Sequence, residues 1–412
     1  MTKYIGVGIS VTTFLVCLLA GEVLLWSFAQ VPDPYEQFKY SRPVNPFIRS
    51  EFPINYHAIT DNTEGLPGVE AQNVFSTNNM GFRGDSIVVP KPKNEYRIFM
   101  IGGSTTECLI LDDSAAITAI LQKRLNKAVG SELSIKVYNA GKSGDASPDH
   151  ISMLAHRIVH LEPDMVIVFS GVNDLTRSIH GYDYTHYIKR DIAKFPVPVL
   201  RFAATEFQLP RRLYYLLKPL TVSDQEILEA IEAKADSRGK TILVSDIRMK
   251  INLLRSKPIS NKKPRLDVDS YAKNLTTLAG IAKGQDIRMV LMTQQTTWNS
   301  TIDPEARNWH WMLYRDVRYR EELMHAAMEK LNDAIRDLAA EFKIPLYDLA
   351  RSLPKSTEFF YDDMHFNTNG ARVAGVELAS LIIKEDLLAP EPVGKEDLET
   401  LQQLAPKDRD DL

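Results

Sequence analysis

The stretch RIFMIGGSTTE, from Arg97 to Glu107, runs four apolar residues into two glycines and a cluster of hydroxyl side chains. The apolar run predicts a short buried strand, and the glycines allow a tight turn where that strand ends. Such a turn would leave Ser104 exposed above the strand, which suits a nucleophile. An isolated serine at a turn is more often a helix cap, so the rest of the chain has to decide between the two interpretations.

The sequence beyond this stretch alternates short apolar runs with amphipathic segments. We predict strands at 96–101, 134–141, 164–171, 287–294 and 344–350, and helices at 115–129, 149–161 and 321–342. Strands that alternate with helices predict an α/β fold, in which helices cover both faces of a parallel sheet. Because 412 residues exceed the usual size of one domain, one large domain with insertions is expected.

Changes in composition divide the chain into four parts. Residues 31–95 are rich in Pro and Asn and lack a helical period, which predicts an extended linker packed on the domain. The domain itself is expected at 96–385. An insertion at about 175–268 interrupts the alternation of strands and helices, and insertions of this length are usually functional. The stretch 386–412 is charged and poor in large apolar residues, which is typical of a mobile tail.

Residues 1–30 carry a targeting signal. The run from Ile5 to Ala29 is apolar except for Glu22 and is long enough to cross a hydrocarbon core of about 30 Å. Lys3 before it favours an orientation with the N-terminus inside. The sequence therefore predicts a single-pass anchor in a bacterial inner membrane, with the domain outside the cytoplasm. Alternatives are a signal peptide cleaved after Ser27-Phe28-Ala29, which would secrete the protein, and a buried helix.

The bulk composition excludes several classes of site. A net charge of -4 gives no broad attraction to nucleic acid. Two cysteines provide neither a disulfide framework nor a cysteine-rich zinc site. His156 and His160 are four residues apart on a predicted helix, but no H-E-x-x-H pattern accompanies them. We expect no metal and no cofactor.

Three further strand ends carry polar residues or glycines that could serve catalysis. Gly144 follows the second strand, where a glycine lets a backbone N–H approach a ligand closely. Asn173 follows the third strand and offers a side-chain amide donor. In YDDMHF, after the last strand, His365 could act as a general base, with Asp362 or Asp363 orienting it. Each motif alone is an ordinary turn, but the carboxyl ends of parallel strands meet at one edge of the sheet.

Together these blocks resemble the SGNH hydrolase family, also called GDSL-type esterases and lipases. Its blocks match GGST, the glycine of GKSGDAS, GVND and DDMH in this order. The resemblance implies a flavodoxin-like three-layer α/β/α sandwich and a triad of Ser104, His365 and Asp362. It also implies an oxyanion hole made by the backbone amides of Ser104 and Gly144 and the side chain of Asn173. The family spacing selects Asp362 over Asp363.

The substrate is less well defined by the sequence. Trp298, Trp309 and Trp311 lie after the fourth strand, on a loop expected to overhang the site, and could form a wall that grips a sugar or an acyl chain. We expect a serine esterase that hydrolyses an O-acyl, mainly acetyl, ester of a carbohydrate, or else a lipid ester. Alternatives are an O-acyltransferase acting on an extracytoplasmic polysaccharide and a non-catalytic binding or assembly protein of the same fold. The oligomeric state is not indicated.

Overall fold

The computed structural model of the chain describes residues 2–30, 47–48, 51–62, 65–130, 133–181, 207–217, 241–243, 251–252, 254–299, 302–312 and 317–388. Most of the insertion predicted at 175–268 and nearly all of the tail predicted from 386 lie outside the described residues.

A five-stranded parallel sheet forms the centre of the domain. Its strands are β3 (Glu95–Gly102), β4 (Ser134–Asn139), β5 (Met165–Phe169), β8 (Arg288–Met292) and β10 (Leu346–Tyr347), in the spatial order β10-β8-β5-β3-β4. The first strand, β3, thus lies between the second and the third, so the winding of the chain reverses there. In open parallel sheets, sites form at this reversal, outside the carboxyl ends of the strands.

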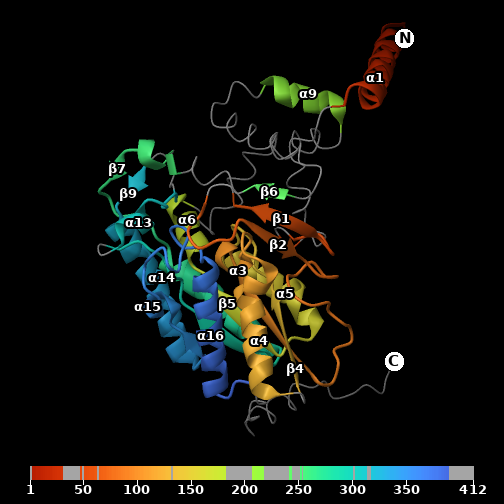
Figure 1. The fold of residues 1–412 in the computed structure, drawn as a ribbon. Helices are drawn as coiled ribbons and strands as arrows, with labels where there is room; N and C mark the ends of the chain where they lie inside the picture. Colours follow the sequence, from red (N-terminus) through yellow and green to blue (C-terminus); the bar gives the residue numbers. More distant parts are fainter. Residues whose placement is uncertain are drawn as a thin grey trace.

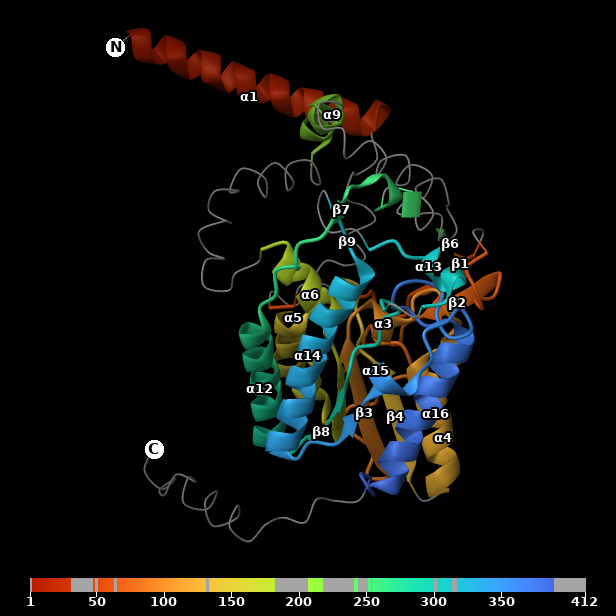
Figure 2. The ribbon, with the colours of Figure 1, turned by 90° about the vertical axis from the view of Figure 1, so that its left-hand side faces the viewer.

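Long helices cover both faces of the sheet (Figures 1 and 2). On one face lie α4 (Ile117–Val129) and α16 (Thr368–Lys384), and on the other lie α5 (Ser147–His156), α12 (Val268–Gly284) and α14 (Glu321–Phe342). The sheet separates two apolar clusters, one under each helix layer. Because both faces are covered, β5 is buried along its whole length. The predicted α/β fold with a parallel sheet is confirmed.

The next elements are short and lie outside the central sheet. They are α3 (Ser104–Glu107), η1 (Asp113–Ala115), η2 (Ile158–Leu161), α6 (Val172–Ile179), α9 (Gln208–Leu217), α13 (Pro304–Arg307), α15 (Leu349–Ser352), and the parallel pair β7 (Ile259–Ser260) and β9 (Arg318–Tyr319). The helix predicted at 321–342 coincides with α14. The strand predicted at 344–350 is shorter than expected, because only Leu346 and Tyr347 pair with β8 before the chain turns into α15.

The segment that the sequence predicts as an extended linker, 31–95, contributes a small sheet in its described part. There β1 (His57–Asp61) pairs antiparallel with β2 (Gln72–Ser76), and β6 (Thr241–Leu243) pairs parallel with β1. Two carboxylates at the start of η1 fasten β2 to the domain. Asp112 accepts the Val74 N–H at 3.1 Å, and Asp113 accepts the Ser76 N–H at 3.0 Å.

The apolar N-terminal run forms helix α1 (Thr2–Phe28), which projects from the domain together with α9 (Figure 1). The Glu22 carboxylate accepts N–H groups from Gln208 and Leu209 at the start of α9. Within the described part of the chain, no helix combines the length and apolar character needed to cross a bilayer. The predicted transmembrane anchor is therefore not supported, and the extracytoplasmic location stays a prediction.

Candidate active site

The nucleophile candidate, Ser104, begins α3 directly after β3. The glycine before it is required by close packing rather than by an unusual backbone angle, since φ of Gly103 is -89°. A Cβ atom on Gly103 would lie 2.5 Å from Nδ2 of Asn173. The turn thus presses against the loop after β5 and leaves the Ser104 side chain half-buried at the carboxyl end of the sheet.

The structure brings the three residues of the predicted triad together across 261 residues of chain. Nε2 of His365 lies 2.7 Å from Oγ of Ser104, and Nδ1 of the same ring lies 2.7 Å from Oδ2 of Asp362. Asp362 and His365 come from the loop between α15 and α16, and their side chains are buried. Hydrogen bonds on both ring nitrogens fix the orientation of the imidazole.

The environment of Asp362 keeps its carboxylate ionised. Burial raises the pKa of this group, but the charge and hydrogen bond of His365, with further hydrogen bonds from the backbone, bring the pKa below its usual value. Oδ1 accepts the N–H groups of Met364 at 3.0 Å and His365 at 2.8 Å. A hydrogen-bonded carboxylate beside a histidine can stabilise an imidazolium ion that forms during proton transfer.

Asp363, the rival carboxylate, points into a different network. Its Oδ1 accepts the Trp298 indole N–H at 2.8 Å, and its Oδ2 accepts the backbone N–H groups of Trp311 at 2.6 Å and Met312 at 3.3 Å. Burial raises the pKa of Asp363, against the opposing effect of His310. Asp363 therefore holds the loop around Trp311, whereas Asp362 faces His365.

The predicted oxyanion donors follow three neighbouring strands of the central sheet, β3, β4 and β5. Gly144 adopts the left-handed region at φ +79°, which few other residues tolerate. Within the described residues, the backbone N–H groups of Ser104 and Gly144 donate to no acceptor. Nδ2 of Asn173 donates to the Asp145 carbonyl at 2.8 Å. An amide nitrogen carries two hydrogens, so a second N–H is left for a ligand.

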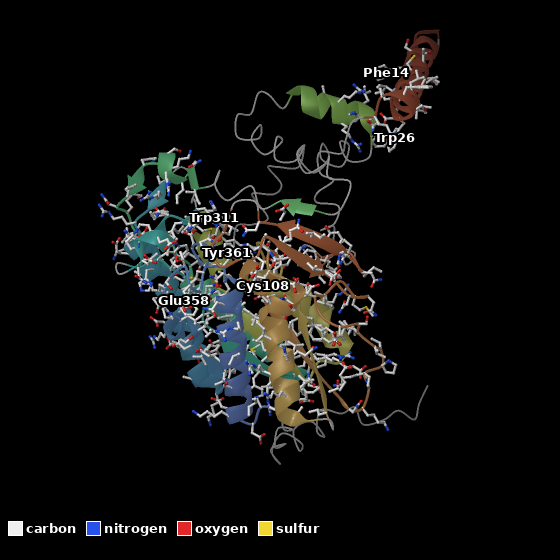
Figure 3. All side chains as sticks on the ribbon, viewed as in Figure 1. Phe14, Trp26, Cys108, Trp311, Glu358 and Tyr361 are labelled. Carbon is white, nitrogen blue, oxygen red and sulfur yellow. The ribbon has the colours of Figure 1, made fainter. Side chains whose placement is uncertain are left out.

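The three tryptophans of the predicted substrate wall occupy different environments. Trp298 is 3% exposed and packs in the core, bonded to Asp363. Trp309 and Trp311 are half-buried and pack beside Tyr361. Figure 3 shows Trp311 and Tyr361 together at the strand-end side of the domain. A role in gripping substrate stays a prediction for all three tryptophans.

Sequence reasoning missed Arg83, which fastens the nucleophile turn from the segment before β3. The buried guanidinium donates to the carbonyls of Glu107 and Cys108, both at 2.7 Å, at the end of α3. It also pairs with Asp113 at 2.8 Å. The Glu107 carbonyl has no partner inside so short a helix, so Arg83 satisfies it, while the Cys108 carbonyl also accepts the Leu111 N–H at 3.0 Å. Its only sequence signal is an arginine between two glycines, in GFRG.

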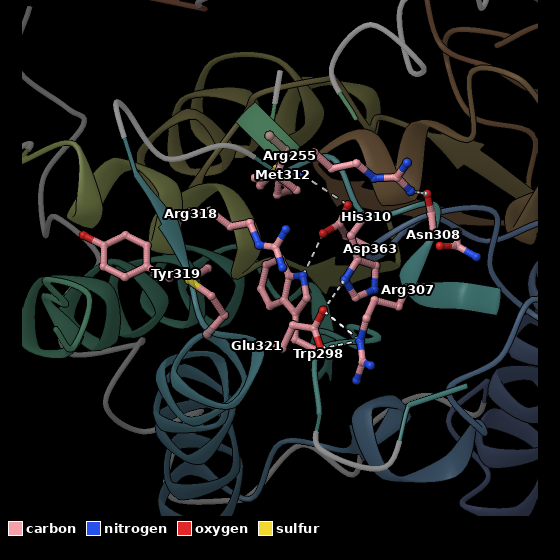
Figure 4. Close-up of a pocket in the computed structure, with 12 residues that line it drawn as sticks. Arg255, Trp298, Arg307, Asn308, His310, Met312, Arg318, Tyr319, Glu321 and Asp363 are labelled. Carbon is pink, nitrogen blue, oxygen red and sulfur yellow. Dashed lines mark hydrogen bonds and ion pairs between the residues drawn. The ribbon is translucent and has the colours of Figure 1, made fainter. Parts of the chain in front are cut away.

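A cavity of about 250 Å³ lies beside the loop that carries Asp363 (Figure 4). Asp363 and Trp298 form part of its wall, and Arg255, Arg307 and Arg318 contribute positive charge. His310 is buried there; burial lowers its pKa, but the Asp363 and Glu321 carboxylates raise it above the usual value. Ser104 and His365 do not line this cavity. It adjoins the predicted triad from the side of Asp363.

A known protein family matches most of the described domain. The profile of the GDSL-like lipase/acylhydrolase family matches residues 100–373, from β3 to α16. The chain belongs to this family. The predicted family resemblance is confirmed, and the protein is accordingly a hydrolase. The matched range includes all strands of the central sheet except the start of β3, together with the loops that carry Ser104, Asn173 and His365.

Solved structures of GDSL-like and related hydrolases are similar to the chain at low identity. A lipase/acylhydrolase from Enterococcus faecalis has 15% identity and a TM-score of 0.38, covering 70% of this chain and 96% of that one. An acetylxylan esterase from Geobacillus stearothermophilus has 16% identity and a TM-score of 0.37, covering 71% and 96%. A GDSL-like lipase from Bacteroides thetaiotaomicron has 13% identity and a TM-score of 0.36, covering 72% and 93%. No curated protein sequence matched.

Proposed function

We propose that this hydrolase is a serine esterase that uses Ser104, His365 and Asp362 and forms an acyl-enzyme. The observation that carries the proposal is the continuous chain of contacts from Ser104 Oγ through the imidazole to the Asp362 carboxylate, each contact 2.7 Å long. A serine hydroxyl is a weak nucleophile unless an adjacent base accepts its proton. His365 is within hydrogen-bond reach to do so, and Asp362 holds its ring.

The proposed reaction has two steps. His365 takes the proton of Ser104 as Oγ attacks the ester carbonyl, and the resulting imidazolium then gives that proton to the departing alcohol. Water attacks the acyl-enzyme in the second step, His365 again acting first as base and then as acid. The negative oxygen of each tetrahedral intermediate would be stabilised by the N–H groups of Ser104, Gly144 and Asn173.

Replacing Asn173 with alanine is expected to lower kcat by about a hundred- to a thousand-fold, because one oxyanion donor is lost. KM should change little, since the ground-state carbonyl needs this donor less than the intermediate does. Asn173→Asp is the matched control for shape: it keeps the size of the side chain but places an acceptor against the oxyanion, so its kcat should be no higher. Steady-state kinetics at saturating ester would test this. A raised KM with unchanged kcat would instead indicate a ground-state binding role.

We further propose an O-acetylated carbohydrate as the substrate and a lipid ester as the second candidate. The support is the pair of half-buried indoles of Trp309 and Trp311 beside the triad loop, because aromatic faces pack well against sugar rings. Transfer of the acyl group to a sugar hydroxyl would use the same acyl-enzyme and differ only in the acceptor. An activity measurement must therefore quantify both hydrolysis by water and transfer of the acyl group to a sugar hydroxyl.

The proposed function is tested by labelling the folded full-length protein with a fluorophosphonate and locating the adduct by mass spectrometry. An activated serine predicts an adduct on Ser104 that is absent from heat-unfolded protein. Acetate release is then measured from acetylated xylo-oligosaccharides and from short-chain glycerol esters, with acetylated acceptor sugars quantified in parallel. Folded protein that gives no adduct on Ser104 would overturn the esterase proposal and favour the non-catalytic alternative.

A further inference from the structure

The indole of Trp311 reaches the carboxylate of the proposed triad. Nε1 of Trp311 donates to Oδ2 of Asp362 at 2.7 Å, which is the same oxygen that lies 2.7 Å from Nδ1 of His365. The other oxygen, Oδ1, accepts two backbone N–H groups, from Met364 and His365. Four donors therefore surround the carboxylate, two on each oxygen. Removal of any one leaves a lone pair of a buried, charged group without a partner.

The rings around Asp362 share one orientation. The plane of Trp311 is within 4° of the plane of His365, with centroids 6.2 Å apart, and Tyr361 lies within 6° of the imidazole at 5.4 Å. Ring N–H bonds lie in the ring plane, so parallel planes let both N–H groups point at one oxygen. The indole thus restricts rotation of the Asp362 carboxylate, and through it the tilt of the imidazole.

The backbone that carries the Trp311 indole is itself held in place. The backbone N–H groups of Trp311 and Met312 donate to Asp363, whose other oxygen is held by Trp298. The neighbouring carboxylates of Asp362 and Asp363 thus bind the two ends of the same residue, one its side chain and the other its backbone. A donor held in this way needs no rearrangement during the reaction.

We propose that Trp311 is a positioning residue of the esterase: its indole N–H, fixed by Asp363, holds the Asp362 carboxylate that orients His365. This inference rests on the proposed triad. The N–H also neutralises part of the charge that Oδ2 presents to the imidazole. Without it, the carboxylate would present a larger negative charge to the imidazole and would be held less firmly beside it.

Other titratable groups surround this site, and they are the same residues in the wild type and in the Trp311 variants. They are Glu107 from α3, Cys108, His310, Tyr361 and Asp363. Burial raises the pKa of Glu107, and the charges of Lys142 and Arg83 oppose this rise. Because a substitution at Trp311 changes none of these residues, a shift in the pH profile can be compared directly between wild type and variant.

Replacing Trp311 with phenylalanine removes the N–H and keeps an aromatic ring. We expect the acid limb of the pH profile to move upward by about half to one pH unit. On the plateau, kcat is expected to fall about tenfold with KM little changed, because the base is less well aligned. The rate of fluorophosphonate labelling of Ser104, measured against pH, gives the same profile without knowledge of the natural ester.

Two further variants complete the test. Trp309→Phe alters the same kind of ring in the same loop, and its acid limb should coincide with that of the wild type, whatever its KM. If Trp311→Phe does not fold, benzothienylalanine at position 311 replaces the N–H by sulfur and keeps the bicyclic shape. Wild type that labels at Ser104, with an acid limb unchanged in the 311 variant, would overturn the inference and leave the triad intact. Wild type that does not label would overturn the triad itself.

Discussion

Replacing His365 with alanine is expected to lower kcat by about 10⁴- to 10⁶-fold, the range seen when the base of a serine triad is removed. The reason is geometric: His365 Nε2 is the base placed 2.7 Å from Ser104 Oγ, and without it the hydroxyl keeps its proton. Ser104→Ala should be equally inactive. The double variant should be no worse than either single variant, because the two residues act as one unit. Steady-state kinetics on an acetylated ester would measure all three.

A matched control for this experiment lies next to the nucleophile. Thr105 is buried, and its hydroxyl makes no hydrogen bond within the described residues. Thr105→Val preserves the shape of the side chain and should retain activity close to that of the wild type. Residual activity within tenfold of wild type in folded His365→Ala would show that another base serves Ser104, and would contradict the proposed mechanism.

Replacing Asp362 with asparagine is expected to lower kcat by about 10⁴-fold. All four hydrogen bonds to the Asp362 carboxylate come from N–H donors or from the imidazole. An amide placed there must turn its own NH₂ group toward donors in either orientation. With the NH₂ toward His365, the imidazole would adopt the wrong tautomer for accepting the serine proton. Because the pKa of Asp362 is lowered, the effect should persist throughout the neutral pH range.

Asp363→Asn serves as a control that distinguishes a loss of activity from a loss of stability. The Asp363 carboxylate also accepts only N–H donors, from Trp298, Trp311 and Met312, so an amide causes a comparable local conflict. We expect each variant to lose about 1–3 kcal/mol of unfolding free energy, measured by chemical denaturation. Only Asp362→Asn should lose most of its activity, while Asp363→Asn should stay within about tenfold of wild type, since it acts through the Trp311 loop. Equal losses of kcat would contradict the assignment of Asp362 as the orienting carboxylate.

The central sheet and the places of the proposed catalytic residues could be predicted from the sequence. Buried parallel strands are continuous apolar runs, so β3, β5 and β8 are visible as such. Long helices such as α14 show a clear apolar period. Once the strands are known, parallel pairing places all of their carboxyl ends at one edge. Ser104, Asn173 and His365 follow strand ends, so their proximity follows from the topology.

The elements and contacts that hold the site in place could not be predicted in the same way. β1 and β2 are five-residue strands in a segment rich in Pro and Asn, where no period is long enough to be recognised. Arg83 contacts residues of α3 and its C-terminal end that lie 24 and 25 positions later in the chain. Helix α12 begins where the predicted insertion ends, in a stretch for which we predict no helix from the sequence. Such contacts depend on how irregular loops fold back onto the sheet, which local periodicity does not encode.

The amino-acid sequence by itself thus determined the α/β architecture, the edge of the sheet that carries the site and the types of residue gathered there, because alternation and strand ends are local properties. The spacing in the family resemblance already selects Asp362 over Asp363, but only the tertiary structure gave each carboxylate its partners and placed the Trp311 indole on Asp362, 51 residues away. Both depend on the directions of side chains from two irregular loops. Those directions are set by a few hydrogen bonds between the loops, and such hydrogen bonds between distant residues cannot be read from the sequence.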